Sequence, residues 1–343
     1  MLSIDPVDTV FETEEWCHFV ELRYGLPYAP IRVALPSGET VLIPCNIVET
    51  RFQAFRVLRS CPPDSFGNVY SSRPLTLPLL LDTFQAVSRL PSVHSLTIAF
   101  HPLHRQAGVI RSLPDEYVLS RRGATRVLEL SMSFDKIWEM VFCKQHRRKI
   151  RTAIKRGVHV KIDNSDAGIE AYYPLYVESC RRLGLAHTEP IEFFYDLKAS
   201  LQAYYSLWLA YVDGQATAGL IVLTRGSKVY AYQMSSSEKG WDLYPNHLLF
   251  STIIENACAL GAEYIDFLPT GFAVGPETFK ERFGAKRVPY SVYRVHNRYY
   301  RRLALWKQAV AGRGFKPAAE AEPSLEVELN GAGSPAAEEV DGE

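Results

Sequence analysis

The sequence lacks the short motifs that identify several large classes of enzyme. It has no phosphate-binding Walker loop, no dinucleotide-binding glycine fingerprint, and no serine, histidine and aspartate in an order typical of hydrolases. Its six cysteines are widely scattered and include no C-x-x-C pair, so we expect reduced, mostly buried thiols and no bound metal. These absences disfavour a kinase, a dehydrogenase, a hydrolase and a zinc protein.

Long apolar runs and a basic leader are missing too. No apolar stretch approaches the roughly 20 residues that a membrane-spanning helix needs. The chain begins MLSIDPVDTVFETEEW, which is acidic and lacks the basic and then apolar pattern of a signal peptide. We therefore expect a cytoplasmic protein without a membrane span.

Positive charge is absent from the end of the chain. All 38 lysines and arginines precede residue 317, whereas eight of the 38 acidic residues follow it. The rest of the chain therefore has a net charge of about +8, although the whole is formally neutral. The end is also rich in Ala, Pro, Gly and Glu, so we expect residues 313–343 to form a disordered acidic tail.

Two stretches of the chain predict a similar order of elements. The first is predicted to contain a helix, three strands, a helix and a strand, at residues 8–24, 31–35, 40–48, 55–60, 76–90 and 93–100. The second is predicted to contain two helices, a hairpin across Asp213-Gly214, a strand, a helix and a strand, at residues 167–183, 191–202, 206–212, 216–223, 229–234, 245–261 and 264–268. We therefore expect an α/β (α+β) fold in two tandem modules. His101 and His104 directly follow the first stretch, and we interpret them as loop residues because no third metal ligand accompanies them.

A basic segment joins the two stretches. A strand at 126–130 precedes a helix that runs from Ser133 to Arg156 with an expected break near Phe142, and a strand at 158–162 follows. The second part of this helix is strongly basic with one apolar side. It fits either a solvated charged face or an anchor for phosphate or carboxylate, which guanidinium groups bind bidentately. Aromatic residues do not alternate with these charges, so we expect no DNA partner.

Three short segments together carry a family resemblance. They are RRKIRTAIKRGV at residues 147–158, YIDF at residues 264–267 and FKERFG at residues 279–284. In order and spacing they resemble the FemAB-like branch of the GNAT acyltransferase superfamily, across roughly residues 126–290. This branch includes peptidoglycan bridge-forming aminoacyltransferases and CelD-like acetyltransferases.

The resemblance implies tandem GNAT-like modules, each a mixed, mostly antiparallel sheet flanked by helices. It predicts an N-terminal module at residues 1–125 and an acyltransferase module at residues 126–312. We interpret the first module as degenerate because the loop before its second helix, residues 61–75, carries no evident catalytic cluster.

The resemblance also implies catalytic residues. Lys280 matches the lysine of the family's FK motif, which faces the reaction centre and stabilises a developing oxyanion. Asp266 matches the acidic residue of the last strand, which acts as a base or orients one. Tyr232 lies on the strand that is expected to border the cleft. The residues alone also allow an exposed helix lysine, an aspartate that caps a strand end and a tyrosine that packs on the sheet.

Donor-binding and acceptor-binding residues are implied in the same way. The edge of the strand at 229–234 would hold the donor carbonyl, and the following helix start would meet a pyrophosphate. The candidate donor-binding residues are Gln233, Gly240, Tyr244, Asn246 and His247. Ordinary GNAT proteins have two close glycines where this loop has only one, a departure shared by family members that use aminoacyl-tRNA. The candidate acceptor-binding residues are Arg148 and Arg151, because the family's acceptor cleft lies beside their helix.

These patterns together predict an N-acyltransferase. It would move an acyl group from acyl-CoA, a co-substrate and not a permanently bound cofactor, to an amine or hydroxyl. The resemblance implies a small-molecule or glycan-precursor acceptor from cell-envelope or exopolysaccharide pathways. Residues 163–205 leave room only for ordinary helices and not for the long helical hairpin of tRNA-dependent members, which favours acyl-CoA. An aminoacyl-tRNA-dependent transferase and a non-catalytic ligand-binding module are the alternatives.

Overall fold

The computed structural model describes residues 9–48, 56–60, 66–185, 188–269 and 274–302. The expected acidic tail at residues 313–343 lies outside the described residues, as do Cys61 and the first residue of the strand predicted at 55–60. None of the helices in this described part combines the length and the apolar character that crossing a membrane requires.

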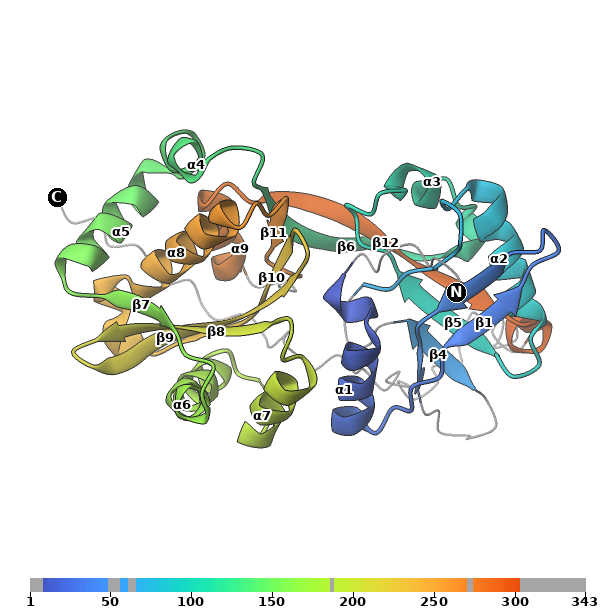
Figure 1. The fold of residues 1–343 in the computed structure, drawn as a ribbon, viewed down its shortest axis with the longest axis horizontal. Helices are drawn as coiled ribbons and strands as arrows, with labels where there is room; N and C mark the ends of the chain where they lie inside the picture. The colour runs from blue at the N-terminus through green and yellow to red at the C-terminus, as the bar shows by residue number, and fades with distance from the viewer. Residues whose placement is uncertain (1–8, 49–55, 61–65, 186–187, 270–273, 303–343) are drawn as a thin grey trace, which may run out of the picture.

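The described chain forms two lobes that share one ten-stranded sheet (Figure 1). The strands lie in the order β3-β4-β5-β12-β6-β11-β10-β9-β8-β7. The N-terminal lobe contains α1 (Glu14–Tyr24), β3 (Asn46–Val48), β4 (Val57–Ser60), α2 (Leu77–Arg89), β5 (Ser95–Ala99), α3 (Ala107–Arg111) and a separate hairpin of β1 (Ile31–Ala34) and β2 (Thr40–Ile43). The C-terminal lobe contains α4 (Phe134–Met140), α5 (Lys144–Lys155), β7 (His159–Ile162), α6 (Asp166–Arg182), α7 (Ile191–Ser200), β8 (Tyr205–Val212), β9 (Gln215–Arg225), β10 (Lys228–Ser236), α8 (Pro245–Ala259), β11 (Tyr264–Asp266) and α9 (Val274–Arg282).

The same strand-helix-strand unit occurs once in each lobe. In the N-terminal lobe β4 and β5 are parallel and α2 connects them; in the C-terminal lobe β10 and β11 are parallel and α8 connects them. All other neighbouring strands described in the sheet are antiparallel. The predicted α/β fold, with a mixed and mostly antiparallel sheet flanked by helices, is confirmed.

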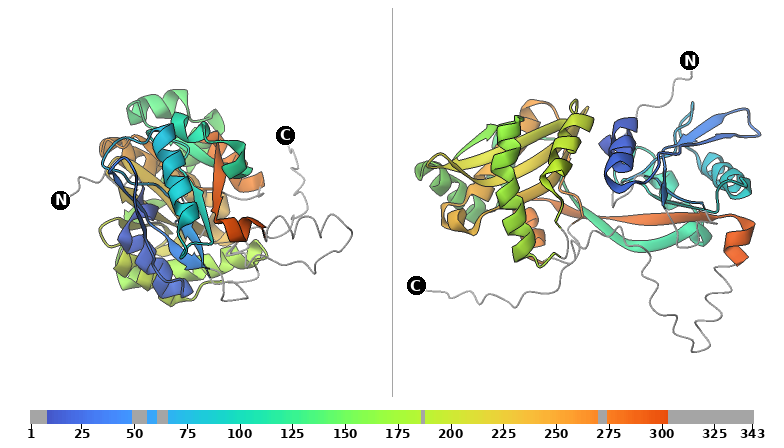
Figure 2. Two further views of the ribbon diagram at one scale, coloured as in Figure 1. Left: turned by 90° about the vertical axis from the view of Figure 1, so that its right-hand side faces the viewer. Right: turned by 90° about the horizontal axis from the view of Figure 1, so that it is seen from below.

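Two long strands, β6 (Val118–Glu129) and β12 (Lys286–His296), join the lobes (Figure 2). They pair with each other along most of their length. In addition, β12 pairs with β5 of the N-terminal lobe, and β6 pairs with β11 of the C-terminal lobe. The strand that follows each strand-helix-strand unit therefore completes the sheet of the other lobe. The boundary expected between residues 125 and 126 lies inside β6, and the division into two modules stays a prediction.

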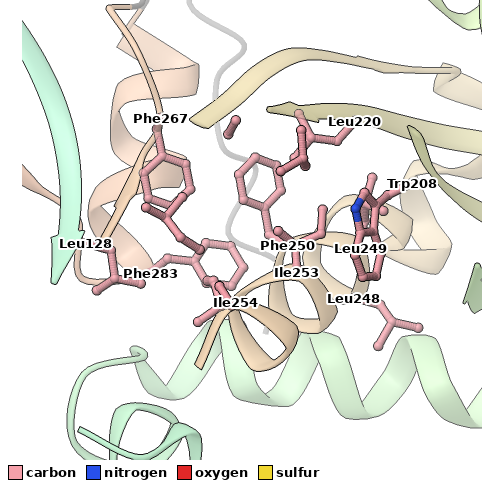
Figure 3. Close-up of a cluster of buried hydrophobic side chains, with 14 of the residues drawn as sticks. Leu128, Trp208, Leu220, Leu248, Leu249, Phe250, Ile253, Ile254, Phe267 and Phe283 are labelled. Carbon is pink, nitrogen blue, oxygen red and sulfur yellow. The ribbon is translucent and has the colours of Figure 1, made fainter. Parts of the chain in front are cut away.

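Three clusters of buried apolar side chains hold the helices on the sheet. On one face of the C-terminal lobe, Phe250 of α8 packs against Phe267 and Phe283 (Figure 3). Fully burying one such side chain contributes roughly 1.5–3 kcal/mol, so this cluster fixes α8 against the sheet. Helices α6 and α7 cover the other face, and α1 of the N-terminal lobe reaches α7 through Phe19 and Phe193, whose ring centroids are 5.3 Å apart.

Several local predictions are confirmed by the structure. The basic helix does break near Phe142, since α4 ends at Met140 and α5 begins at Lys144. The hairpin between β8 and β9 turns at Asp213 and Gly214, whose φ angles are 49° and 78°. Two consecutive positive φ angles are typical of the tight turn that this dipeptide favours.

Other local predictions are wrong. The strand predicted at 40–48 is split, because Pro44 has no backbone amide and separates β2 from β3, which belong to different sheets. The strand predicted at 126–130 begins much earlier, at Val118, because β12 pairs with it. The strand predicted at 264–268 ends at residue 266, and Leu268 adopts a left-handed φ of 57°. Helix α3 was not predicted.

Candidate active site

The parallel strands β10 and β11 separate near the middle of the sheet. They pair from Lys228 and Tyr264 to Tyr230 and Asp266, where β11 ends, while β10 continues to Ser236. Within the described residues, this later part of β10 has no registered partner on its β11 side. A register shift between residues 231 and 233 also bends β10 against β9. Backbone groups of β10 beyond the split are thus outside the β11 ladder, and the Ser236 amide at its end donates to Ser179 Oγ over 3.0 Å.

Helix α8 begins close to the end of β10. A short 3-10 helix, η3 (Glu238–Leu243), connects them. The side-chain amide of Asn246 in the first turn of α8 donates to Ser236 Oγ over 3.2 Å, and Trp241 Nε1 donates to the same oxygen over 3.3 Å. Tyr244 precedes α8 with a left-handed φ of 58°. Pro245 has no backbone amide, and the amides of His247 and Leu248 donate to the Tyr244 carbonyl over 3.1 and 3.4 Å, so it is the partial positive charge of the helix start that favours an anion here.

Three basic side chains surround this helix start. Arg156, which directly follows α5, donates to the Asp242 carbonyl over 2.7 Å, and Lys149 Nζ of α5 lies 5.3 Å from the centre of the Tyr244 ring. Arg182 of α6 donates to the Ser236 carbonyl over 3.1 Å and lies 4.7 Å from the centre of the Trp241 ring. Sequence reasoning did not select these three residues. The spacing of seven between Lys149 and Arg156 was an available signal, because it places both on one side of a helix.

The structure places the two predicted acceptor-binding arginines elsewhere on α5. Arg148 is exposed. Arg151 is also exposed, and its guanidinium lies 5.5 Å from the centre of the Trp138 ring of α4. Arg151 therefore lies over α4 and not at the start of α8.

Asp266 is fully buried at the end of β11 and accepts three hydrogen bonds. Its Oδ2 accepts from His101 Nε2 over 2.7 Å, and its Oδ1 accepts from the Leu268 amide over 2.7 Å and from Thr125 Oγ1. A buried carboxylate needs such donors, since an unpaired one is costly. This arrangement fits an orienting role better than the role of a base.

Lys280 of α9 is buried and points to the end of β11. Its Nζ donates to the carbonyls of Phe267 and Leu268 over 2.7 and 3.1 Å, and the side chain is only 8% exposed. Burial lowers the pKa of Lys280 to about 8, although the negative charges of Asp266 and Glu277 oppose the shift. The structure therefore brings Lys280 and Asp266 together, and Lys280 is not the exposed helix lysine that the residues alone allowed.

The remaining candidates on β10 lie at its bend. The Tyr232 ring is partly buried, 5.7 Å from the Trp16 ring, and burial raises the pKa of its hydroxyl, which stays protonated at neutral pH. The Gln233 carbonyl accepts from the Tyr172 hydroxyl over 3.1 Å. The same hydroxyl lies 3.1 Å from Ser235 Oγ, so α6 fixes the later part of β10.

Gly240 is buried in the lobe, and His247 is half-buried. A Cβ atom on Gly240 would lie 3.1 Å from Thr217 Cβ, so a larger residue there would require Thr217 to shift. The His247 ring lies 4.6 Å from the His146 ring and 5.1 Å from the Phe279 ring. Burial lowers the pKa of His247 to about 3 and that of His146 to about 4, so both rings are neutral parts of the core at pH 7. The structure thus brings Gly240, Tyr244 and Asn246 to the start of α8 but turns the His247 ring into the core.

His101 is the site neighbour that sequence reasoning missed. It does lie in a loop, as predicted, but it is only 2% exposed and stacks on the Tyr264 ring at 5.4 Å with an interplanar angle of 12°. Its partner Asp266 is 165 residues away in the sequence, and no local pattern signals such a contact. Among the described residues, no three His, Cys, Asp or Glu side chains gather as a metal site.

In the C-terminal lobe, a bent strand separates from its parallel neighbour beside a helix start. Residues 142–281 match the family model described as an acetyltransferase (GNAT) domain. This segment, less than half of the chain, is therefore similar to a GNAT acetyltransferase domain.

Solved structures extend the similarity to nearly the whole chain. The structure of FemX superposes with a TM-score of 0.68 at 15% identity, covering 88% of this chain and 95% of that one. A conserved protein of unknown function from Bacteroides thetaiotaomicron superposes with a TM-score of 0.55 at 9% identity, covering 86% and 100%. The C-terminal domain of a protein named as a lysylphosphatidylglycerol synthetase from Agrobacterium fabrum gives a TM-score of 0.53 at 12% identity, covering 87% and 92%. No curated protein sequence matches this chain. At these identities the similarity shows that the two-lobed fold is that of FemX.

Proposed function

We propose that the protein transfers an acyl group from acyl-CoA to an amine or hydroxyl of a cell-envelope or exopolysaccharide-type acceptor. The observation that carries the proposal is the separation of β10 from β11 directly beside the start of α8. This arrangement offers backbone donors for a carbonyl and a positive helix end for phosphates within one region.

The donor would lie along the later part of β10. Its pyrophosphate would meet the positive start of α8, with Lys149 of α5 and Arg156, which directly follows α5, nearby to add positive charge. Its thioester carbonyl would accept a hydrogen bond from the backbone of β10 near Tyr232. Acyl-CoA is a co-substrate in this scheme and not a resident cofactor.

The chemistry needs few groups from the protein. The acceptor nitrogen or oxygen loses a proton and forms a bond to the thioester carbon, the carbon-sulfur bond breaks, and CoA leaves as a thiolate that takes up a proton. The ammonium of Lys280 would stabilise the negative charge that develops at the end of β11. Tyr232 would contribute a hydroxyl at the bend of β10, and Asp266 would orient its neighbours because three donors already occupy its oxygens.

The class of acceptor is supported by similarity and not by a bound ligand. The fold of FemX and the FemAB-like motifs support a cell-envelope precursor, and a lysylphosphatidylglycerol synthetase domain shares the fold. We assign Arg148 and Arg151 to acceptor binding, because they are exposed cations on a helix of the transferase lobe.

Calorimetry with acetyl-CoA and an acetylation assay with a panel of amines and amino sugars would test the donor. We expect Arg156→Gln and Lys149→Gln each to weaken acetyl-CoA binding by roughly ten- to a hundredfold, since a charge-assisted hydrogen bond contributes about 1.5–3 kcal/mol. Lys155→Gln is the matched control, because Lys155 is an exposed lysine of the same helix. Binding without turnover of any acceptor would support a non-catalytic binding module, and a lack of binding would remove acyl-CoA as the donor.

An aminoacyl-tRNA donor is the second candidate. The exposed side of α5 carries Lys144, Arg148, Arg151 and Lys155, a row of charges that suits a phosphate backbone. If tRNA is the donor, its affinity should fall steeply between 50 and 200 mM salt (on the order of a hundredfold or more), and Lys155→Gln should reduce the salt dependence. A shallow salt dependence would exclude this candidate.

A further inference from the structure

We infer that His101, in the N-terminal lobe, is a positioning residue for Lys280 in the transferase lobe. This inference rests on the proposed function, since it gives Lys280 a role at the reaction centre. It also gives a role to the N-terminal lobe, which we interpreted from the sequence as degenerate. The loop after β5 in this lobe carries His101, which contacts Asp266 at the end of β11.

A continuous series of contacts connects His101 to Lys280. His101 Nε2 lies 2.7 Å from Asp266 Oδ2. The other oxygen of Asp266 accepts from the Leu268 amide over 2.7 Å, which closes a turn in which Leu268 has a left-handed φ of 57°. The carbonyls of Phe267 and Leu268 then accept from Lys280 Nζ. A leucine in this conformation needs such support, because a side chain makes positive φ unfavourable.

The hydrogen bonds of His101 also fix which of its nitrogens carries the proton. The Leu103 amide donates to His101 Nδ1 over 3.2 Å, so this nitrogen must be an acceptor. The proton on Nε2 therefore points to Asp266. Tyr264 stacks on the ring, and the Phe66 ring meets it at 4.6 Å with an interplanar angle of 83°, so the ring is held on more than one side.

Thr125 and Arg126 of β6 add a second link between the lobes. Thr125 Oγ1 donates to Asp266 Oδ1, and Arg126 forms ion pairs with Glu277 and Glu281 of α9, the helix that carries Lys280. Since β6 pairs with β12 as well as β11, the ends of β5 and β11 are held in one sheet. Neither lobe alone contains both ends of the contact between His101 and Asp266.

Three substitutions test the inference. His101→Leu removes the donor to Asp266 but keeps an apolar side chain, whereas His101→Gln keeps a donor close to the position of Nε2. His104→Leu is the matched control, because His104 is a buried histidine of the same loop with its own amide partner at Gln106. Thermal unfolding by circular dichroism would confirm that each variant is folded.

The first readout is the titration of Lys280, followed by NMR of ¹³C-labelled lysine, with Lys280→Met used to assign the signal. The charged groups that face Lys280 are Asp266 of β11, Arg126 of β6 and Glu277 of α9. We expect Lys280 to titrate near pH 8 in the wild type, in His104→Leu and in His101→Gln. In His101→Leu we expect it to titrate about one pH unit lower, because a loosened turn stabilises the ammonium less. An unchanged titration in folded His101→Leu would overturn the inference, whether or not the protein turns over a substrate.

The second readout separates this inference from the proposed function. We expect kcat of His101→Leu to fall at least tenfold with little change in KM for acyl-CoA, and His101→Gln to recover most of it. If Lys280→Met keeps full kcat, the role of Lys280 in the proposed function is wrong. If Lys280→Met is inactive but His101→Leu is fully active with an unchanged pH profile, only the positioning role of His101 fails.

Discussion

Acid should destabilise this protein through two histidines that pack against each other and against aromatic rings in the C-terminal lobe. His146 and His247 lie with their ring centroids 4.6 Å apart among Phe279 and Phe283, and burial lowers their pKa values to about 4 and about 3. In the unfolded chain both rings should titrate near pH 6.5. Below that pH the two histidines bind protons in the unfolded state but not in the folded state. The free energy of unfolding must therefore decrease as the pH decreases.

The size of the effect follows from this linkage. Between pH 7.5 and 4.5 each ring should cost about 2 kcal/mol of folding stability, and both together about 4 kcal/mol. This is a large fraction of the 5–15 kcal/mol that stabilises a typical domain. The two rings are close enough that protonating one makes protonation of the other harder, so the pair is expected to act as one unit.

Urea unfolding followed by circular dichroism at a series of pH values would measure the effect. His146→Leu and His247→Leu should each lose about 2 kcal/mol less than the wild type between pH 7.5 and 4.5, whatever their stability at pH 7.5. His159→Gln, at an exposed position on β7, should follow the wild-type pH dependence. If both leucine variants lose as much stability as the wild type over this range, the reasoning about the buried pair is refuted.

Two further predictions concern packing. Gly284→Ala should lower the free energy of unfolding by about 3 kcal/mol, because Gly284 has a φ of 88° and the added Cβ would lie 2.0 Å from Val141 Cγ1. Gly157→Ala, with a φ of 78° but open space around it, should cost only about 1 kcal/mol, and equal losses in urea unfolding would show that the clash is relieved cheaply. Tyr172→Phe should cost about 1 kcal/mol, because its hydroxyl bonds to β10, and amide hydrogen exchange in the later part of β10 should rise; unchanged exchange would contradict this role of α6.

Most elements of the fold were predictable because their signals are local. Glycine ended α1 and proline began α8 where the sequence indicated, and the basic helix broke where predicted. The failures came from long-range pairing: β6 is extended by β12, which lies more than 150 residues further along the chain, and Pro44 divides a run whose two halves join different sheets. A local pattern reports a propensity, but pairing with a distant strand decides the length of a strand.

The sequence by itself determined the domain type and two residues of the candidate site. The FK motif and the aspartate of the YIDF segment marked Lys280 and Asp266, and the structure places them together. Tertiary structure alone decided that Lys149 and Arg156, and not Arg151, meet the start of α8, because the direction of a helical side chain depends on how the helix docks. It also decided that a histidine of the other lobe holds Asp266. That contact exists because β6 and β12 cross between the lobes and hold two strand ends in one sheet, and residues so far apart in the chain meet only when that sheet is assembled.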